Sequence, residues 1–194
     1  MAVAEPADDW QAVRLTEARQ VHALMGDPAD DWPPADLTIR DRYRLLQREG
    51  SAAAVRFLAH ALPRLEAIAW AVRVVEDAAR RDPPPPRARH ALDTALRWLG
   101  ERSDAHRRAA RAAAEEVGMP VAERFLGQAI FYGGGSIAAP EQSPVMPPDH
   151  AAARYVAAAI GQIAHRSDDA AATFAAALAI GEAIAARGTS ATER

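Results

Sequence analysis

Residues 63–80, with the sequence PRLEAIAWAVRVVEDAAR, decide the fold of this chain. Apolar residues occupy most of the circumference of this segment, which is typical of a helix surrounded by other helices. Pro63 can either start the helix or kink a longer one, because it cannot donate a hydrogen bond to the carbonyl of Ala59. We therefore predict a central buried helix over residues 63–80.

Signals for helix starts and stops recur around this segment, whereas strand signals hardly appear. Thr38 and Asp41 form a capping box, Ser103 can cap another helix, and glycines such as Gly26 and Gly188 are typical stops. A first helix is expected over about 10–25. The pattern predicts an all-α fold, a single-domain bundle of seven or eight helices around the central one.

The expected domain covers residues 1–187, and the tail 188–194 is expected to be disordered. Four consecutive prolines make residues 82–86 a stiff connector. The longest segment without helix signals is the Gly- and Pro-rich loop 133–149. Loops of this length inside a domain are usually functional or disordered.

The composition of the 194 residues excludes several kinds of chemistry. Hydrophobic residues make up 49% and charged residues 25%, yet the sequence has no Lys, Asn or Cys, and all of its basic residues are Arg. Lysine-based phosphate loops, Schiff bases, thiolate nucleophiles, disulfides and cysteine metal sites are therefore impossible. A net charge of -3 supplies no basic field for nucleic acid.

Location is predicted from the N-terminus and from one alanine-rich run. The N-terminus, MAVAEPADDW, is acidic where a secretory signal is basic and apolar, so a cytoplasmic location is expected. Residues 170–186 are only marginally long enough to span a membrane, and alanine is weakly apolar. We expect a buried helix there and no membrane insertion.

A polar stripe crosses the predicted central helix. Glu66, Trp70, Arg73 and Asp77 fall at i, i+4, i+7 and i+11. The stripe can form a small-molecule or peptide site, and it can equally be a buried ion pair that fixes helix register. We expect the structural role, with Glu66 paired to Arg73 or to Arg64.

His60 and Arg64 lie on the approach to this stripe. They are one turn apart if helical geometry persists through the proline. The His60 imidazole can titrate near neutral pH. Both residues join the stripe as candidate ligand-binding residues.

The loop 133–149 holds the second group of candidates. Gly134, Gly135 and Ser136 permit a sharp turn or an anion-binding nest, although they follow the end of a helix, where a cap leading into a tethered loop is expected. The prolines lower the entropy cost of ordering, and Ile137, Val145 and Met146 offer apolar anchors. We expect the loop to be held against the domain and to form part of an interaction surface.

No catalytic or metal motif is visible. The six histidines form no HExxH motif and no pair at i, i+3 or i+4, and no GxSxG sequence occurs. We therefore assign no catalytic residue, no metal and no cofactor.

Three segments carry a resemblance to a known family. AHALPRLEAIAW (59–70), FYGGGSIAAP (131–140) and PVMPPDHAAARYVAAAI (144–160) resemble a family of bacterial all-helical proteins of unknown function. This chain departs from the family pattern at Ala69 or Ala71, where a second aromatic residue is usual, and at Gly133, where Ser is usual. The resemblance implies an association with gene clusters for type VI secretion and phosphopeptide recognition, and hence an accessory or adaptor role.

Two functions are compatible with these observations. One is a non-enzymatic interaction module with a protein partner, for which a homo-oligomer is one option. The other is a small-molecule-binding protein or enzyme that uses Glu66, Trp70 and Arg73. A hollow converging on His60, Glu66 and Trp70 would favour the second, and a packed stripe beside an exposed apolar patch would favour the first.

Overall fold

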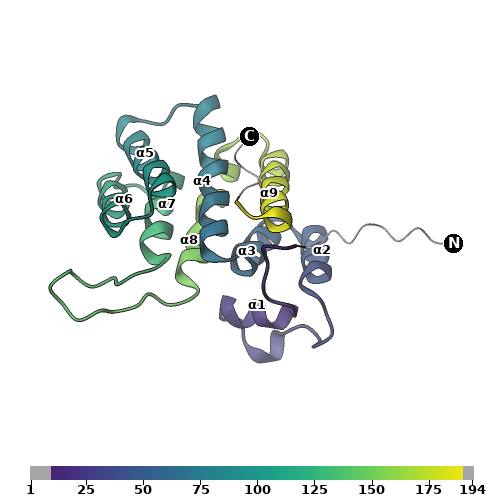
Figure 1. The fold of residues 1–194 in the computed structure, drawn as a ribbon. Helices are drawn as coiled ribbons and strands as arrows, with labels where there is room; N and C mark the ends of the chain where they lie inside the picture. Colours follow the sequence, from purple (N-terminus) through teal and green to yellow (C-terminus); the bar gives the residue numbers. More distant parts are fainter. Residues whose placement is uncertain (1–9, 190–194) are drawn as a thin grey trace.

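A computed structural model describes residues 10–189 of the chain (Figure 1). Over these residues it contains nine α-helices, one short 3-10 helix and no strand. The helices are α1 (Ala18–Met25), α2 (Ile39–Glu49), α3 (Ser51–Ala61), α4 (Arg64–Arg81), α5 (Pro86–Gly100), α6 (Asp104–Glu116), α7 (Ala122–Tyr132), α8 (Ala151–Arg166) and α9 (Ala170–Arg187). The prediction of an all-α single domain is confirmed.

The nine helices of residues 10–189 slightly exceed the expected seven or eight, and two of the breaks between them fall at single residues. Gly50 ends α2 and begins α3. Pro63 is the N-cap of α4, so the chain breaks there instead of kinking. The residue before a proline avoids helical geometry, and Leu62 is accordingly extended, with ψ of 145°.

The prediction for the first helix is wrong in its starting point. Residues 10–17 are not helical, and α1 begins at Ala18. Backbone groups of this segment bond to other parts of the chain: the Ala12 N–H donates to the Ala185 carbonyl, and Glu17 forms an isolated bridge with Thr38. These long-range hydrogen bonds take the place of the helical backbone hydrogen bonds that the local sequence favours.

Helix α4 lies at the centre, as predicted. It packs against α3, α5, α7, α8 and α9, and Figure 1 shows it between α5, α6 and α7 on one side and α3 and α9 on the other. Trp70 is fully buried, and its Nε1–H donates to the Ala177 carbonyl of α9 at 2.7 Å. A Cβ at Gly181 would lie 2.8 Å from this indole, so the close approach of α4 and α9 requires glycine there.

A second close approach joins α6 to α7. A Cβ at Gly127 would lie 2.4 Å from the Ala110 carbonyl oxygen, a distance that no side chain tolerates. Alanine is abundant at such contacts, because small residues let helix axes come close together. The high alanine content thus gives a core of tightly spaced helices.

Helix α9 is the one helix among residues 10–189 that is long and apolar enough to cross a membrane by length and composition. It packs against α3, α4 and α8, with Phe174, Leu178 and Ile184 buried. Residues 190–194 of the expected tail 188–194 lie outside the described residues. Gly188 ends α9 with a φ of 71°.

Candidate functional site

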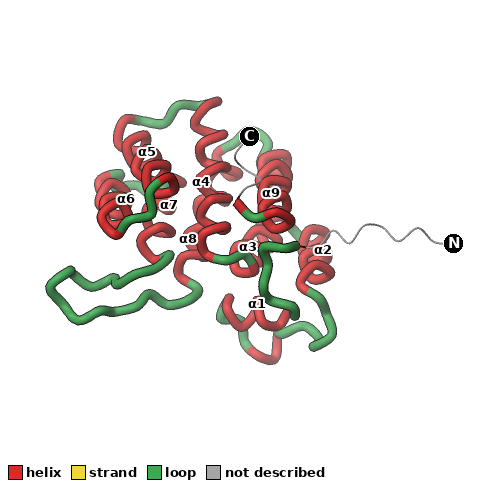
Figure 2. The backbone as a smooth tube through the Cα atoms, in the orientation of Figure 1, coloured by secondary structure: helices red, strands yellow, loops and turns green. Residues whose placement is uncertain are grey.

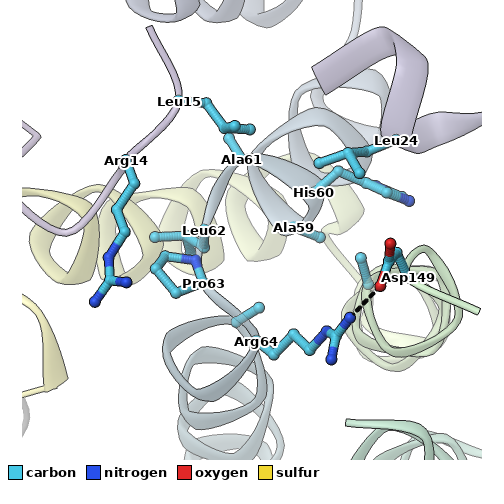
Figure 3. A pocket seen from close by; sticks show the side chains of 12 residues that line it. Arg14, Leu15, Leu24, Ala59, His60, Ala61, Leu62, Pro63, Arg64 and Asp149 are labelled. Carbon is cyan, nitrogen blue, oxygen red and sulfur yellow. Dashed lines mark hydrogen bonds and ion pairs between the residues drawn. The ribbon is translucent and has the colours of Figure 1, made fainter. Parts of the chain in front are cut away.

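The break at Pro63 creates a hollow at the corner between α3 and α4, which we call the His60 hollow (Figure 3). Its volume is about 250 Å³. The walls come from the segment before α1, from α1, from residues 59–64 and from the start of α8. The lining is mostly apolar and includes Leu15, Leu24, Leu62 and Pro63, with Arg14, His60, Arg64 and Asp149 as its polar residues.

His60 is the buried polar residue of this hollow. Only 5% of the residue is exposed. Its Nδ1 lies 2.7 Å from the Arg56 carbonyl oxygen, so in the neutral ring Nδ1 carries the proton, and Nε2 is an acceptor without a partner. Burial lowers the pKa of His60, and the nearby charges of Arg56 and Arg154 lower it further. At neutral pH the hollow therefore contains an uncharged imidazole with a free lone pair.

An ion pair stands at the edge of the same hollow. Arg64, at the start of α4, donates to the carboxylate of Asp149, which ends the loop 133–149. Figure 3 shows this pair on the same side of the hollow as the His60 ring, with Arg14 on the opposite side. The pair ties the loop to the α3–α4 corner, although both side chains are exposed.

Only two members of the predicted polar stripe, Arg73 and Asp77, pair with each other. Arg73 pairs within its own helix, with Asp77 at 3.4 Å and Glu76 at 3.8 Å. Glu66 has no hydrogen bond or ion pair within residues 10–189, so its predicted pairing with Arg73 or Arg64 is wrong. Two helical turns, about 10 Å, separate Glu66 from Arg73, and each arginine has a nearer carboxylate.

Trp70 does not join a site either, since it is buried against α9. Of the candidates around the central helix, the structure brings only His60 and Arg64 to one hollow. Glu66, Trp70 and Arg73 do not line it. The hollow sits at the helix break and not along the stripe.

The loop 133–149 is fixed at its base by Arg107 of α6, which is only 4% exposed. Its guanidinium donates to the carbonyls of Phe131 and Ser136, at 2.7 and 2.8 Å. It also pairs with Asp104, and hydrogen bonds from Arg108 and Arg107 hold the pKa of that carboxyl below its usual value. Gly135 has a φ of 68°, and a Cβ there would lie 3.2 Å from Arg107. Glycine at this position therefore allows Arg107 to bind the base of the loop.

Hydrogen bonds also close the two arms of the loop upon each other. The Ser136 hydroxyl accepts from the N–H of Ala138 and of Val145, and the Ile137 N–H donates to the Val145 carbonyl at 2.8 Å. A Cβ at Gly134 would meet nothing within 4 Å, so this glycine faces open space. The base of the loop is thus fixed by polar bonds, whereas the sequence led us to expect apolar anchors that hold the whole loop against the domain.

The returning arm of the loop, at Val145 and Met146, departs from that prediction. Val145 is 51% exposed and Met146 is 62% exposed, so neither anchors the loop in the domain. Figure 2 shows the loop extending away from the helices. Hydrogen bonds hold the two arms of the loop together, and the apolar side chains of Val145 and Met146 are left in solvent.

Two further groups of polar residues were not found from the sequence. Glu123 of α7 is 3% exposed, and its Oε2 has no partner. Tyr43 donates to Glu182 at 2.9 Å, and burial together with that carboxylate raises the pKa of Tyr43. Glu123 looks in the sequence like an ordinary acidic residue in a first helical turn, and 139 positions separate Tyr43 from Glu182. In residues 10–189 no group of three His, Asp or Glu residues is placed to hold a metal ion.

These features define the class: an all-α, single-domain protein with a small hollow at a helix break and a clasped, projecting loop. The chain belongs to DUF6931, a family of unknown function whose model matches residues 43–185. That range contains the loop and most of the His60 hollow. No curated protein and no solved structure matches the chain.

Proposed function

We propose that the protein is a non-enzymatic interaction module of a bacterial multiprotein system, and that the returning arm of the loop 133–149, at residues 145 and 146, receives a protein partner. One observation carries the proposal: exposed Val145 and Met146 stand on a loop whose base is fixed by Arg107 and Ser136. Exposed apolar side chains on a preordered segment can bind with little further loss of conformational entropy. A flexible, solvated linker would have neither the exposed apolar side chains nor the fixed base.

The setting of this module follows from the resemblance seen in the sequence. We place it in the cytoplasm, as an accessory or adaptor of a system such as type VI secretion. The partner is a different protein or a second copy of this chain. The net charge of -3 supports a protein partner over nucleic acid.

Affinity capture with matched variants tests this proposal. The full chain and a Val145→Ser, Met146→Ser variant are used as baits in a lysate of the native cell, and binding of each retained protein is then measured with the purified pair. We expect the loop variant to lose about tenfold in affinity, since two exposed apolar side chains supply about 1.5 kcal/mol or more on burial.

Met119→Ser is the control for this experiment. Met119 is 65% exposed, much like Met146, but lies between α6 and α7, away from the loop. The control should bind as the unchanged chain does. Equal binding by all three baits contradicts the proposed role of the loop.

A second candidate function is the binding of a small ligand in the His60 hollow. The observation that favours it is the unpartnered Nε2 of a buried, neutral histidine. A ligand hydroxyl could donate to this atom while its apolar part contacts Leu24 and Leu62. Titration of small alcohols against the unchanged chain and His60→Phe, followed by the imidazole NMR signals, tests it: an unshifted His60 signal contradicts this function.

A further inference from the structure

A larger hollow lies at the opposite end of α4, beside the proline connector, and we call it the Glu123 hollow. Its volume is about 500 Å³, within the range of small-molecule sites. Three consecutive prolines, Pro84, Pro85 and Pro86, form one wall. Apolar side chains of Val117, Met119 and Val121, from the α6–α7 connection, form another.

Glu123 is the acidic residue of this apolar hollow. Its Oε2 is buried and accepts no hydrogen bond, although the residue lines the hollow. A buried carboxylate without a donor costs several kcal/mol unless a proton donor or a cation reaches it. The structure thus contains an acceptor that lacks its donor, next to space where one fits.

Two arginines also line this hollow, and neither supplies the missing bond. Arg166 is exposed, lines the hollow and makes no hydrogen bond with Glu123. Arg87 is directed to the Glu116 carbonyl, at 3.5 Å. Because both guanidinium groups stand in solvent, water and salt screen their charges, while the buried Glu123 is screened much less.

We propose that the Glu123 hollow binds a small organic cation, a primary ammonium group on an aliphatic or aromatic body. The ammonium donates to the carboxylate of Glu123, and the body packs on the proline wall and on Val117 and Met119. An ammonium group offers three donors and a compact charge. The apolar walls match the rest of such a ligand and would not suit a simple metal ion.

Three probes with the same phenyl body test the charge requirement: 2-phenylethylammonium, 2-phenylethanol and 3-phenylpropanoate, each titrated calorimetrically into the full chain at neutral pH. We expect the ammonium compound to bind about tenfold more tightly than the alcohol, as for a hydrogen bond to a charged group. The carboxylate should bind most weakly. Equal binding of ammonium and alcohol, tighter binding of the carboxylate, or no binding of the ammonium compound overturns the proposal.

Two variants locate the effect. Glu123→Gln should lower the affinity for the ammonium compound about tenfold and leave that for the alcohol within about twofold. Met119→Arg puts a cation at an exposed wall without touching the core, and should weaken ammonium binding. Met146→Arg, the same change at an equally exposed methionine in the loop, should not.

The second variant keeps the test decisive if Glu123→Gln fails to fold. Unchanged ammonium affinity in Met119→Arg overturns the proposal, as does an equal loss in Met146→Arg. Unchanged affinity in a folded Glu123→Gln protein does so as well. Tighter ammonium binding by Arg166→Gln would support it, because Arg166 is a competing cation that lines the same hollow.

Discussion

A hollow lies near each end of α4, and each contains one buried polar side chain. The two side chains differ in their charge and in their hydrogen bonds. At the start of the helix, His60 satisfies one ring nitrogen with the Arg56 carbonyl and leaves only a neutral acceptor unpaired. At the other end, Glu123 lines an apolar hollow and has a buried carboxylate oxygen with no donor. A neutral imidazole tolerates burial at small cost, whereas a carboxylate does not. The His60 hollow can therefore remain empty, whereas a cation bound in the Glu123 hollow would stabilise the protein.

The largest expected effect concerns the helix that joins these two ends. Val72→Asp places a carboxylate at a fully packed position in the middle of α4, where only 1% of the residue is exposed. The cost of several kcal/mol is comparable to a typical total stability of about 5–15 kcal/mol, so the variant should not fold and both hollows should be lost together. Circular dichroism and thermal melting measure this. Leu45→Asp, at an exposed position of α2, is the control, and a helical Val72→Asp protein with unchanged melting would contradict the central place of α4.

The next effect tests whether Glu123 lacks a partner. Glu123→Met removes the unpaired carboxylate and fills similar space, so the free energy of unfolding should rise by about 1–3 kcal/mol. Glu182→Met is the matched control, because Glu182 accepts bonds from Tyr43 and Gln47. That change should instead lower stability. Denaturation in urea compares the two, and a loss of stability in Glu123→Met would show that the carboxylate has a partner in solution.

The third effect is the pH dependence that His60 contributes. Burial lowers the pKa of His60 in the folded protein, so the unfolded chain binds more protons as the pH falls below the ordinary histidine value of about 6.5. Stability should therefore fall over that range, with a slope of at most about 1.4 kcal/mol per pH unit from this group, and be unaffected by it at higher pH. Urea denaturation at a series of pH values measures it.

His60→Gln should reduce this fall in stability, while His90→Gln should not. His90 is exposed on α5 and serves as the control. Burial of His60 lowers stability only when its imidazole is protonated. The same slope in the unchanged chain and in His60→Gln would contradict a buried neutral His60.

The smallest effect concerns the edge of the His60 hollow. Arg64→Gln removes an exposed ion pair with Asp149 and should cost about 0.2–1 kcal/mol, less at high salt. Arg89→Gln breaks a similarly exposed pair with Asp93 on α5 and should cost about the same. A much larger loss for Arg64→Gln, measured by urea denaturation, would show that this pair holds the loop and the hollow together.

Local signals in the sequence predicted several elements well. The apolar surface of residues 63–80 predicted the central helix, now α4. The Thr38 and Ser103 hydroxyls accept the backbone N–H groups of Asp41 and His106, as their capping positions indicate. Gly188 ends the last helix, as predicted. These features depend on residues within about one helical turn, so a single sequence contains them.

Features that depend on distant partners were predicted poorly. The expected Glu66–Arg pair does not form, because Arg64 meets Asp149 from the far end of the loop. Residues 10–17 leave helical geometry because they bond to the end of α9 and to the segment before α2. The loop was expected to be held against the domain along its length, but only its base is fixed, by Arg107 of another helix.

The sequence by itself determined the all-α class, the central helix, the helix ends and the chemistry that this chain lacks, because periodicity, capping and composition are local properties. Only the tertiary structure decided which polar groups are buried and which of them have partners. Nothing in the first turn of α7 marks Glu123 as different from other glutamates in the chain. Its isolation arises where the proline connector, the α6–α7 connection and α8 meet. Burial and hydrogen-bond satisfaction are set by what surrounds a side chain in space, which spacing along a helix does not specify.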